Sequence, residues 1–280
     1  MRKAGIISPI MVMNPEAQSF DMMIAHNLEP EIYSFRILQS LEKAIKKNIL
    51  PLNKPVKIHL KLDTGMHRLG FEEGNIDELI RKLKANKQIF VQSTFTHLAA
   101  SDMPAHDDFT REQIARFETM AKKVQSAIDH PVLQHVLNSA GITRFPEGQY
   151  DMVRLGISLY GIAYNGEEQG NLENVSTLKS IISQIKDIAP GETVGYNRKG
   201  ITKKNIRIAV VPVGYADGLH RNLGNGNGHL WINGKLAPVV GDVCMDMCMV
   251  DITDIKANEG DEVIIFGNDR PINELAKELG

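Results

Sequence analysis

The sequence predicts an α/β protein, with an incomplete (β/α)8 barrel of the TIM type followed by an all-β domain. Short β-rich runs alternate with helical stretches up to about residue 175, which is typical of a parallel sheet with helical crossovers. Strand-like runs separated by turn signals fill the rest. The 280 residues suffice for one large or two smaller domains. We therefore predict a partial barrel over residues 1–175 and a β domain over residues 176–280.

The barrel is predicted from six strand-like runs. They are residues 9–13, 31–34, 57–62, 89–97, 132–137 and 152–155. The clearest intervening helix begins at Thr110, which with Gln113 predicts a capping box. An apolar stripe follows at helical spacing: Ile114, Phe117, Met120, Val124 and Ile128. A closed barrel needs eight strands, so we expect the chain to lack the first strands.

The β domain is predicted from a second set of strand-like runs. They are residues 178–188, 193–196, 206–213, 230–232, 235–253 and 262–266. Turn signals lie at Pro190-Gly191, Asp217-Gly218, Asn233-Gly234 and Glu259-Gly260. A last helix is predicted from Pro271 and has no cap residues beyond Gly280, so we expect truncation at this end also.

Composition excludes several classes of protein. Thirty-two Lys and Arg against thirty-four Asp and Glu leave no cationic surplus for nucleic acid or an anionic membrane. No apolar run approaches the roughly 20 residues that span a bilayer, which favours a cytoplasmic protein. Cys244 and Cys248 lie four residues apart in a predicted strand, roughly 13 Å, and cannot pair. Two thiols do not complete a zinc site, so we expect no metal.

Polar residues gather where predicted barrel strands end. The segment KLDTGMHRLG places Lys61 at the end of the third run and Arg68 after it, where barrels carry catalytic groups, although a polar surface turn explains the spacing more simply. Ser139 follows the fifth run, and Gly156 and Ile157 follow the sixth. Their backbone N–H groups suit a phosphate site, but two ordinary strand ends are an equal explanation.

Aromatic and acidic residues mark the β domain. Tyr196 and Tyr215 each follow a glycine, and the run from Cys244 to Cys248 is expected to alternate between two faces of a strand, with Met245 opposite Asp246. A half-buried Tyr that fills a strand face is the simpler explanation of each tyrosine.

Together, ordered motifs resemble those of alanine racemase, the pyridoxal phosphate enzyme that interconverts L- and D-alanine for peptidoglycan. The motifs are KLDTGMHRLG, FTHLAASD, NSAG, MVRLGISLYG, GETVGY, VPVGYADGLHR and VVGDVCMDMCMVDIT, and the likeness covers nearly the whole chain. The segments PIMVMNPE and VGYNRKG also resemble the racemase half of polypeptides that fuse a muramoyl-tripeptide ligase to alanine racemase. The family fold is a (β/α)8 barrel followed by a β domain.

The resemblance implies a role for each candidate residue. Tyr196 would be the catalytic base on the L-alanine face, and Arg154 would bond the pyridine nitrogen with support from His97. Ser139, Gly156 and Ile157 would hold the phosphate. Arg68 and the Met245 backbone would hold the substrate carboxylate, and Lys61, at a position carbamylated in some members, would orient Arg68. Tyr215 and Asp246 would line the entry and the site.

One departure from the family bears on activity. The family's Schiff-base lysine lies in a Lys-Ala-Asp/Asn-x-Tyr-Gly-His-Gly stretch that this sequence does not contain. We therefore expect the chain alone to be inactive. The resemblance also implies a homodimer in which Tyr196 and Met245 serve the partner's cofactor. Another racemase or decarboxylase that uses the same cofactor, or a non-catalytic cofactor-binding or interaction fragment, stays open as an alternative.

Overall fold

The computed structural model describes residues 1–47 and 54–279. It divides into two compact units, Met1–Gly156 and Ile157–Gly280, and each is described by itself. Residues 157–177 precede the first strand of the second unit and contain the short helix α6 (Gly166–Gln169). The domain boundary predicted at residue 175 stays a prediction.

The first unit is built on a five-stranded sheet in the order β1-β2-β3-β4-β5, and every pair of neighbours is parallel. The strands are β1 (Met11–Val12), β2 (Glu29–Ile32), β3 (Val56–Lys61), β4 (Ile89–Phe95) and β5 (Leu133–His135). Parallel neighbours in sequence order arise when each strand is followed by a helical crossover of the same hand. The predicted α/β architecture is confirmed.

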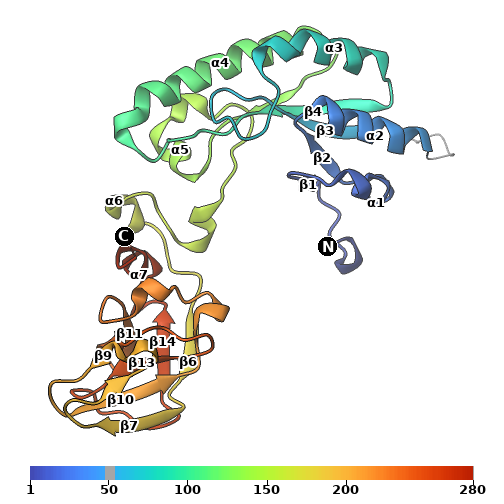
Figure 1. Ribbon diagram of the computed structural model, residues 1–280. Coiled ribbons are helices and arrows are strands. Elements are labelled where there is room, and N and C mark those ends of the chain that lie inside the picture. Colours follow the sequence, from blue (N-terminus) through green and yellow to red (C-terminus); the bar gives the residue numbers. More distant parts are fainter. Residues whose placement is uncertain (48–53, 280) are drawn as a thin grey trace. The chain divides into compact units, whose positions relative to one another are not determined.

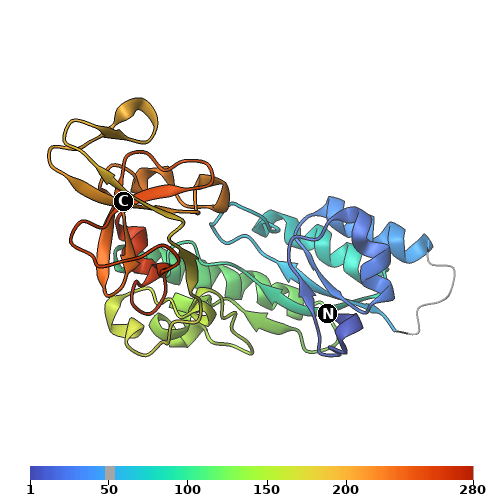
Figure 2. The same ribbon diagram turned by 90° about the horizontal axis from the view of Figure 1, so that it is seen from below.

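Helices cover one face of this sheet. They are α1 (Phe20–Ala25), α2 (Phe35–Lys47), α3 (Ile76–Ala85), α4 (Asp107–Gln125) and α5 (Ser139–Arg144). Helices α2, α3 and α4 lie together along one side of the strands, and Figure 2 shows the same layers turned by 90° (Figures 1 and 2). Apolar side chains of both layers form one core, so the predicted stripe of α4 is confirmed at Ile114, Phe117, Met120 and Val124.

The predicted start of α4 is wrong. The helix begins at Asp107, directly after a 3-10 turn that Pro104 opens, and Thr110 lies fully buried inside it. The Gln113 side chain makes no capping box, because it accepts a hydrogen bond from the Ala99 N–H and donates one to the His97 carbonyl. Pro at the start of a turn and acidic residues in the first helical turn replace the expected cap.

The sixth predicted strand is also wrong, because residues 152–155 form no strand. The Asp151 N–H donates to the Gln134 carbonyl and the Arg154 N–H donates to the Leu137 carbonyl, at 3.2 and 3.0 Å. These two bonds hold the segment beside β5 without building a ladder. The apolar side chains of this segment remain partly exposed in the first unit. They are Met152, Val153 and Leu155.

The second unit is an antiparallel β structure, as predicted. Its seven-stranded sheet has the order β6-β14-β11-β12-β13-β10-β7, and β8 and β9 form a separate pair. The strands are β6 (Leu178–Ile181), β7 (Gln184–Ile188), β8 (Thr193–Val194), β9 (Gly200–Ile201), β10 (Ile206–Val211), β11 (His229–Ile232), β12 (Lys235–Val240), β13 (Cys248–Asp251) and β14 (Glu262–Phe266). The predicted last helix is α7 (Ile272–Lys277).

The predicted strand over residues 235–253 divides into β12 and β13, with a loop between them. Gly241 turns the chain with φ of 69°, and the Cys244 N–H donates to the Met247 carbonyl to close a tight turn. The expected alternation of faces through Met245 and Asp246 is therefore wrong. Both Cys244 and Cys248 are free thiols.

Gly70 closes the loop after β3 and tolerates no side chain. Its φ is 138°, and an added Cβ would lie 2.6 Å from the Asp63 backbone nitrogen. We expect Gly70→Ala to lower the free energy of unfolding by about 1–3 kcal/mol, measured by urea titration of the helical circular-dichroism signal.

The matched control is Gly74→Ala, because an added Cβ there meets no atom within 4 Å. We expect this control to change stability by less than about 0.5 kcal/mol. Equal stability of the two variants would contradict the strain assigned to Gly70.

Candidate active site

The loop after β3 separates Lys61 from Arg68. Asp63 starts the loop by accepting hydrogen bonds from the backbone N–H groups of Gly65 and His67, at 3.0 and 3.1 Å. This turn is favoured by Asp, whose side chain imitates a backbone carbonyl. Lys61 stays 4% exposed at the end of the strand, whereas Arg68 is exposed on the loop.

Arg154 is held by four hydrogen bonds at the carboxyl ends of β4 and β5. Its Nη1 donates to His135 Nδ1 at 2.7 Å and to the His135 carbonyl at 3.0 Å. Its Nη2 donates to the carbonyls of Thr96 and Val136, at 2.6 and 3.0 Å. Burial lowers the pKa of Arg154 to about 10, so the group remains a cation at neutral pH. Among the residues that the structure describes, none accepts a hydrogen bond from its Nε–H.

His97 follows β4 and lies among cations. Burial, together with the charges of Arg154, Arg68 and Lys61 in that order, lowers the pKa of His97 to about 4. The structure thus brings four predicted site residues together at one edge of the first sheet. This edge is the one where (β/α) barrels carry their catalytic groups.

A buried carboxylate balances this positive charge. Glu31 is 1% exposed, and its Oε1 lies 3.0 Å from Lys61 Nζ. The Asn14 backbone N–H donates to the other carboxylate oxygen. Lys61 and Arg154 also lie 5.5 and 5.2 Å from the centre of the Phe95 ring, which therefore contacts both cations.

The predicted phosphate residues lie beside the start of α5. Asn138 caps this short helix by accepting a hydrogen bond from the Gly141 N–H at 3.0 Å. Ser139 is the first helical residue, and the Gly156 N–H donates to its hydroxyl at 2.9 Å. Ile157 follows directly in the chain and is 57% exposed. Ser139 and Gly156 therefore meet, and phosphate binding by them stays a prediction.

In the second unit, two loops present the predicted residues Tyr215 and Met245. The Tyr215 N–H donates to the Cys244 carbonyl and the Ala216 N–H donates to the Met245 carbonyl, both at 3.0 Å. Tyr215 is 41% exposed and Met245 is 54% exposed, and Asp246 beside it is exposed as well. These residues form an open surface of the unit.

Tyr196 is 69% exposed on the turn Tyr196–Arg198, which Asp242 anchors. The Asp242 carboxylate accepts hydrogen bonds from Asn225, Lys199 and Asn197 at 2.8, 3.2 and 3.4 Å. The Asn225 bond is the main cause that lowers the pKa of Asp242, and Lys199 adds to it. A fixed carboxylate thus orients the turn on which Tyr196 lies.

The models of two protein-domain families match the chain. "Alanine racemase, N-terminal domain" matches residues 1–164, and "Alanine racemase, C-terminal domain" matches residues 175–280. The chain belongs to the alanine racemase family. The alanine racemase of Methanococcus maripaludis is 38% identical over 100% of this chain and 76% of its own length. That of Clostridium tetani is 35% identical over 100% of this chain and 73% of its own length.

Solved alanine racemase structures have the same fold. The enzyme of Clostridium difficile 630 matches with a TM-score of 0.87 and 33% identity, over 100% of this chain and 73% of that one. The alanine racemase of Bartonella henselae, solved with covalently bound pyridoxal phosphate, matches with a TM-score of 0.86 and 26% identity, over 99% and 76%. Members of the alanine racemase family are isomerases and depend on pyridoxal phosphate.

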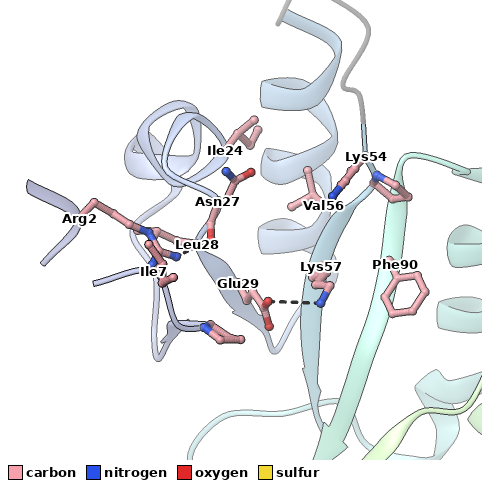
Figure 3. A pocket seen from close by; sticks show the side chains of 12 residues that line it. Arg2, Ile7, Ile24, Asn27, Leu28, Glu29, Lys54, Val56, Lys57 and Phe90 are labelled. Carbon is pink, nitrogen blue, oxygen red and sulfur yellow. Dashed lines mark hydrogen bonds and ion pairs between the residues drawn. The ribbon is translucent and has the colours of Figure 1, made fainter. Parts of the chain in front are cut away.

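Sequence reasoning missed the buried polar side chains of the first sheet: Glu29, Glu31, His59, Ser93 and His135. The signal for Glu31, His59, Ser93 and His135 was the presence of polar residues inside predicted parallel strands, which are otherwise apolar, whereas Glu29 lies before the predicted run 31–34. A cavity of about 680 Å³ lies at the amino ends of β2 and β3, where Glu29, Val56 and Lys57 line it (Figure 3).

The described part of the chain contains neither a candidate metal site nor a candidate membrane-spanning helix. Within residues 1–47 and 54–279, no three His, Cys, Asp or Glu side chains come together in a group that could hold a metal ion. No helix in those ranges has the length and apolarity needed to cross a membrane.

The depressed pKa of His97 predicts that stability falls in mild acid. An unfolded histidine titrates near 6.5, whereas His97 in the fold titrates near 4, so the unfolded chain binds more protons between these values. Stability contributed by neutral His97 is therefore present above pH 6.5 and is lost as the pH falls to 4. We expect the thermal midpoint, followed by circular dichroism, to decrease across this window.

The variant His97→Gln cannot titrate, so its midpoint should depend less on pH over the same window. His26→Gln is the control, because His26 is exposed. If both variants keep the full pH dependence of the unaltered chain, His97 is not its source.

Proposed function

We propose that this chain carries the residues that bind pyridoxal phosphate and alanine in an alanine racemase, which interconverts L- and D-alanine for peptidoglycan synthesis. The observation that carries the proposal is the fixed guanidinium of Arg154, held by four bonds within a cluster of Lys61, Arg68 and His97. Membership of the alanine racemase family supports it.

Several of the predicted residues fit the cofactor. The Nε–H of Arg154 suits the lone pair of a pyridine nitrogen, because a guanidinium can only donate hydrogen bonds. The backbone N–H groups near Ser139, Gly156 and Ile157 suit the phosphate. When bound, pyridoxal phosphate would take up the electron pair left after a proton leaves the α-carbon of alanine. Because the Arg154 guanidinium donates hydrogen bonds and accepts none, it can orient the pyridine nitrogen while remaining a cation.

The remaining candidates would handle the substrate. In this proposal Tyr196 removes or returns the α-proton, and Arg68 and the Met245 backbone bind the alanine carboxylate. Tyr215 and Asp246 line the entry, and Lys61 orients Arg68. We propose a cytoplasmic homodimer in which Tyr196 and Met245 serve the partner's cofactor. Exposure of Tyr196, Tyr215 and Met245 on the second unit agrees with such sharing.

We also propose that the chain alone does not racemise alanine, because it contains no match to the family stretch that carries the cofactor-binding lysine. Fusion to a ligase and truncation at both ends stay predictions from the sequence.

The test supplies the lysine. We expect the chain with pyridoxal phosphate to produce no D-alanine from L-alanine, and a fusion to the N-terminal segment of a related alanine racemase to restore turnover. Chiral amino-acid analysis measures both. In the active fusion, Tyr196→Phe should lower kcat by about 10²- to 10⁴-fold for L-alanine, since a positioned proton-transfer group contributes this much.

Tyr164→Phe in the same fusion is the matched control, because Tyr164 lies outside the predicted site, and it should keep most of the activity. A fusion that folds, binds the cofactor and still does not turn over alanine would favour the non-catalytic alternative. Faster turnover of bulkier amino acids would favour another racemase or decarboxylase.

A further inference from the structure

A row of four buried polar side chains crosses the first sheet and ends at Arg154. We call Glu29, His59, Ser93 and His135 the buried polar row; they are 8%, 5%, 0% and 0% exposed. The links are Arg154 Nη1 to His135 Nδ1 at 2.7 Å, His135 Nε2 to Ser93 Oγ at 2.9 Å, Ser93 Oγ to His59 Nδ1 at 2.6 Å, and His59 Nε2 to Glu29 Oε2 at 3.0 Å. The row joins all four strands from β5 to β2.

The two ends of the row fix the position of every proton between them. Arg154 can only donate, so His135 Nδ1 must accept and the proton of His135 lies on Nε2. His135 therefore donates to Ser93. The carboxylate of Glu29 can only accept, so His59 donates from Nε2 and its Nδ1 accepts from the Ser93 hydroxyl. All four hydrogen bonds point from Arg154 towards Glu29.

Both imidazoles are neutral, as this arrangement requires. Burial, together with the charge of Arg154, lowers the pKa of His135 to about 3. Burial also lowers the pKa of His59 against the opposing charge of Glu29. A neutral imidazole has one donor and one acceptor nitrogen, so each histidine can pass the bond direction on to its neighbour.

Glu29 is suited to the end of the row. It lies at the start of β2, where its Oε1 is 3.7 Å from Lys57 Nζ, the ion pair drawn in Figure 3. It also borders the 680 Å³ cavity at the amino ends of the strands, which keeps the carboxylate in reach of water (Figure 3). A buried charge persists when it is paired and hydrogen-bonded. Glu29 is therefore a permanent acceptor.

We propose that Glu29 is a positioning residue for Arg154, because it orders the protons of the buried polar row so that His135 always presents a lone pair to the guanidinium. Arg154 favours the same order from the other end, but without a fixed acceptor at the β2 end the row could reverse at the cost of the bond between Arg154 and His135. His59 would then donate to Ser93 and Ser93 to His135, so that an N–H of His135 would face an N–H of Arg154. The role in cofactor binding rests on the proposed function, whereas the proton order does not.

The first test reads the protons directly and needs no cofactor. In the unaltered chain with ¹⁵N-labelled histidine, two-bond ¹⁵N–¹H correlation at pH 7 should show His59 and His135 as neutral Nε2–H tautomers. Each resonance is assigned by a single His→Gln substitution. A proton on Nδ1 of either ring, or a charged ring, overturns the proposal.

The second test asks whether Glu29 acts through the row. We expect Glu29→Gln to shift the His135 ¹⁵N resonances, and to shift them several-fold less when Ser93→Ala has removed the middle link. Glu31→Gln is the matched control: it removes the same charge two residues further along β2, and its effect on His135 should not depend on Ser93. Equal shifts from Glu29→Gln with and without Ser93 overturn the proposal, since they indicate only a long-range field.

The same variants separate this inference from the proposed function. Glu29→Gln should weaken binding of pyridoxal phosphate to the chain about tenfold, by analogy with the loss caused by removing outer-shell partners of metal ligands. Unchanged affinity overturns the positioning role. Absence of any binding by the unaltered chain contradicts the proposed function, while the imidazole resonances still decide the proton order.

Discussion

The constraint on which the first unit depends is the need to hold the part-buried Arg154 guanidinium by hydrogen bonds from both of its terminal nitrogens. A buried cation without hydrogen bonds costs several kcal/mol, so its acceptors must be in place when the sheet forms. Three of them are the carbonyls of Thr96, His135 and Val136, which lie where β4 and β5 end. Carbonyls at strand ends are free of the sheet ladder. The edge that holds the site is thus made by the termination of two strands.

Aromatic and acidic side chains complete this arrangement. The Phe95 ring stacks on His135 with an angle of 2° between the planes and contacts the cations of Lys61 and Arg154. Glu31 is paired with Lys61 and raises the pKa of Arg154 against the effect of burial. The positive cluster is therefore stabilised from within the sheet, and its groups are set before any ligand arrives.

Local patterns predicted the architecture, but not the polar interior. The apolar stripe of α4 and the alternation of strands with helices depend on neighbouring residues, so a single sequence shows them. The strand predicted over residues 152–155 was wrong because strand formation depends on a neighbour that local pattern does not reveal. The start of β2 was missed because Pro30 argues against a central strand. The bond between Ser93 and His135 joins residues 42 apart, which no local pattern indicates.

The acidic residues of β2 themselves specify how this strand pairs. In the observed register Glu31 lies opposite His59, so Glu29 reaches His59 and Glu31 reaches Lys61. A slip of one residue would turn both carboxylates into the apolar core. A slip of two residues in one direction would separate Glu31 from Lys61, and a slip of two residues in the other would bring Glu31 towards Asp63. Because an unpaired buried charge is so costly, the residues that look least suited to a strand are those that fix its register.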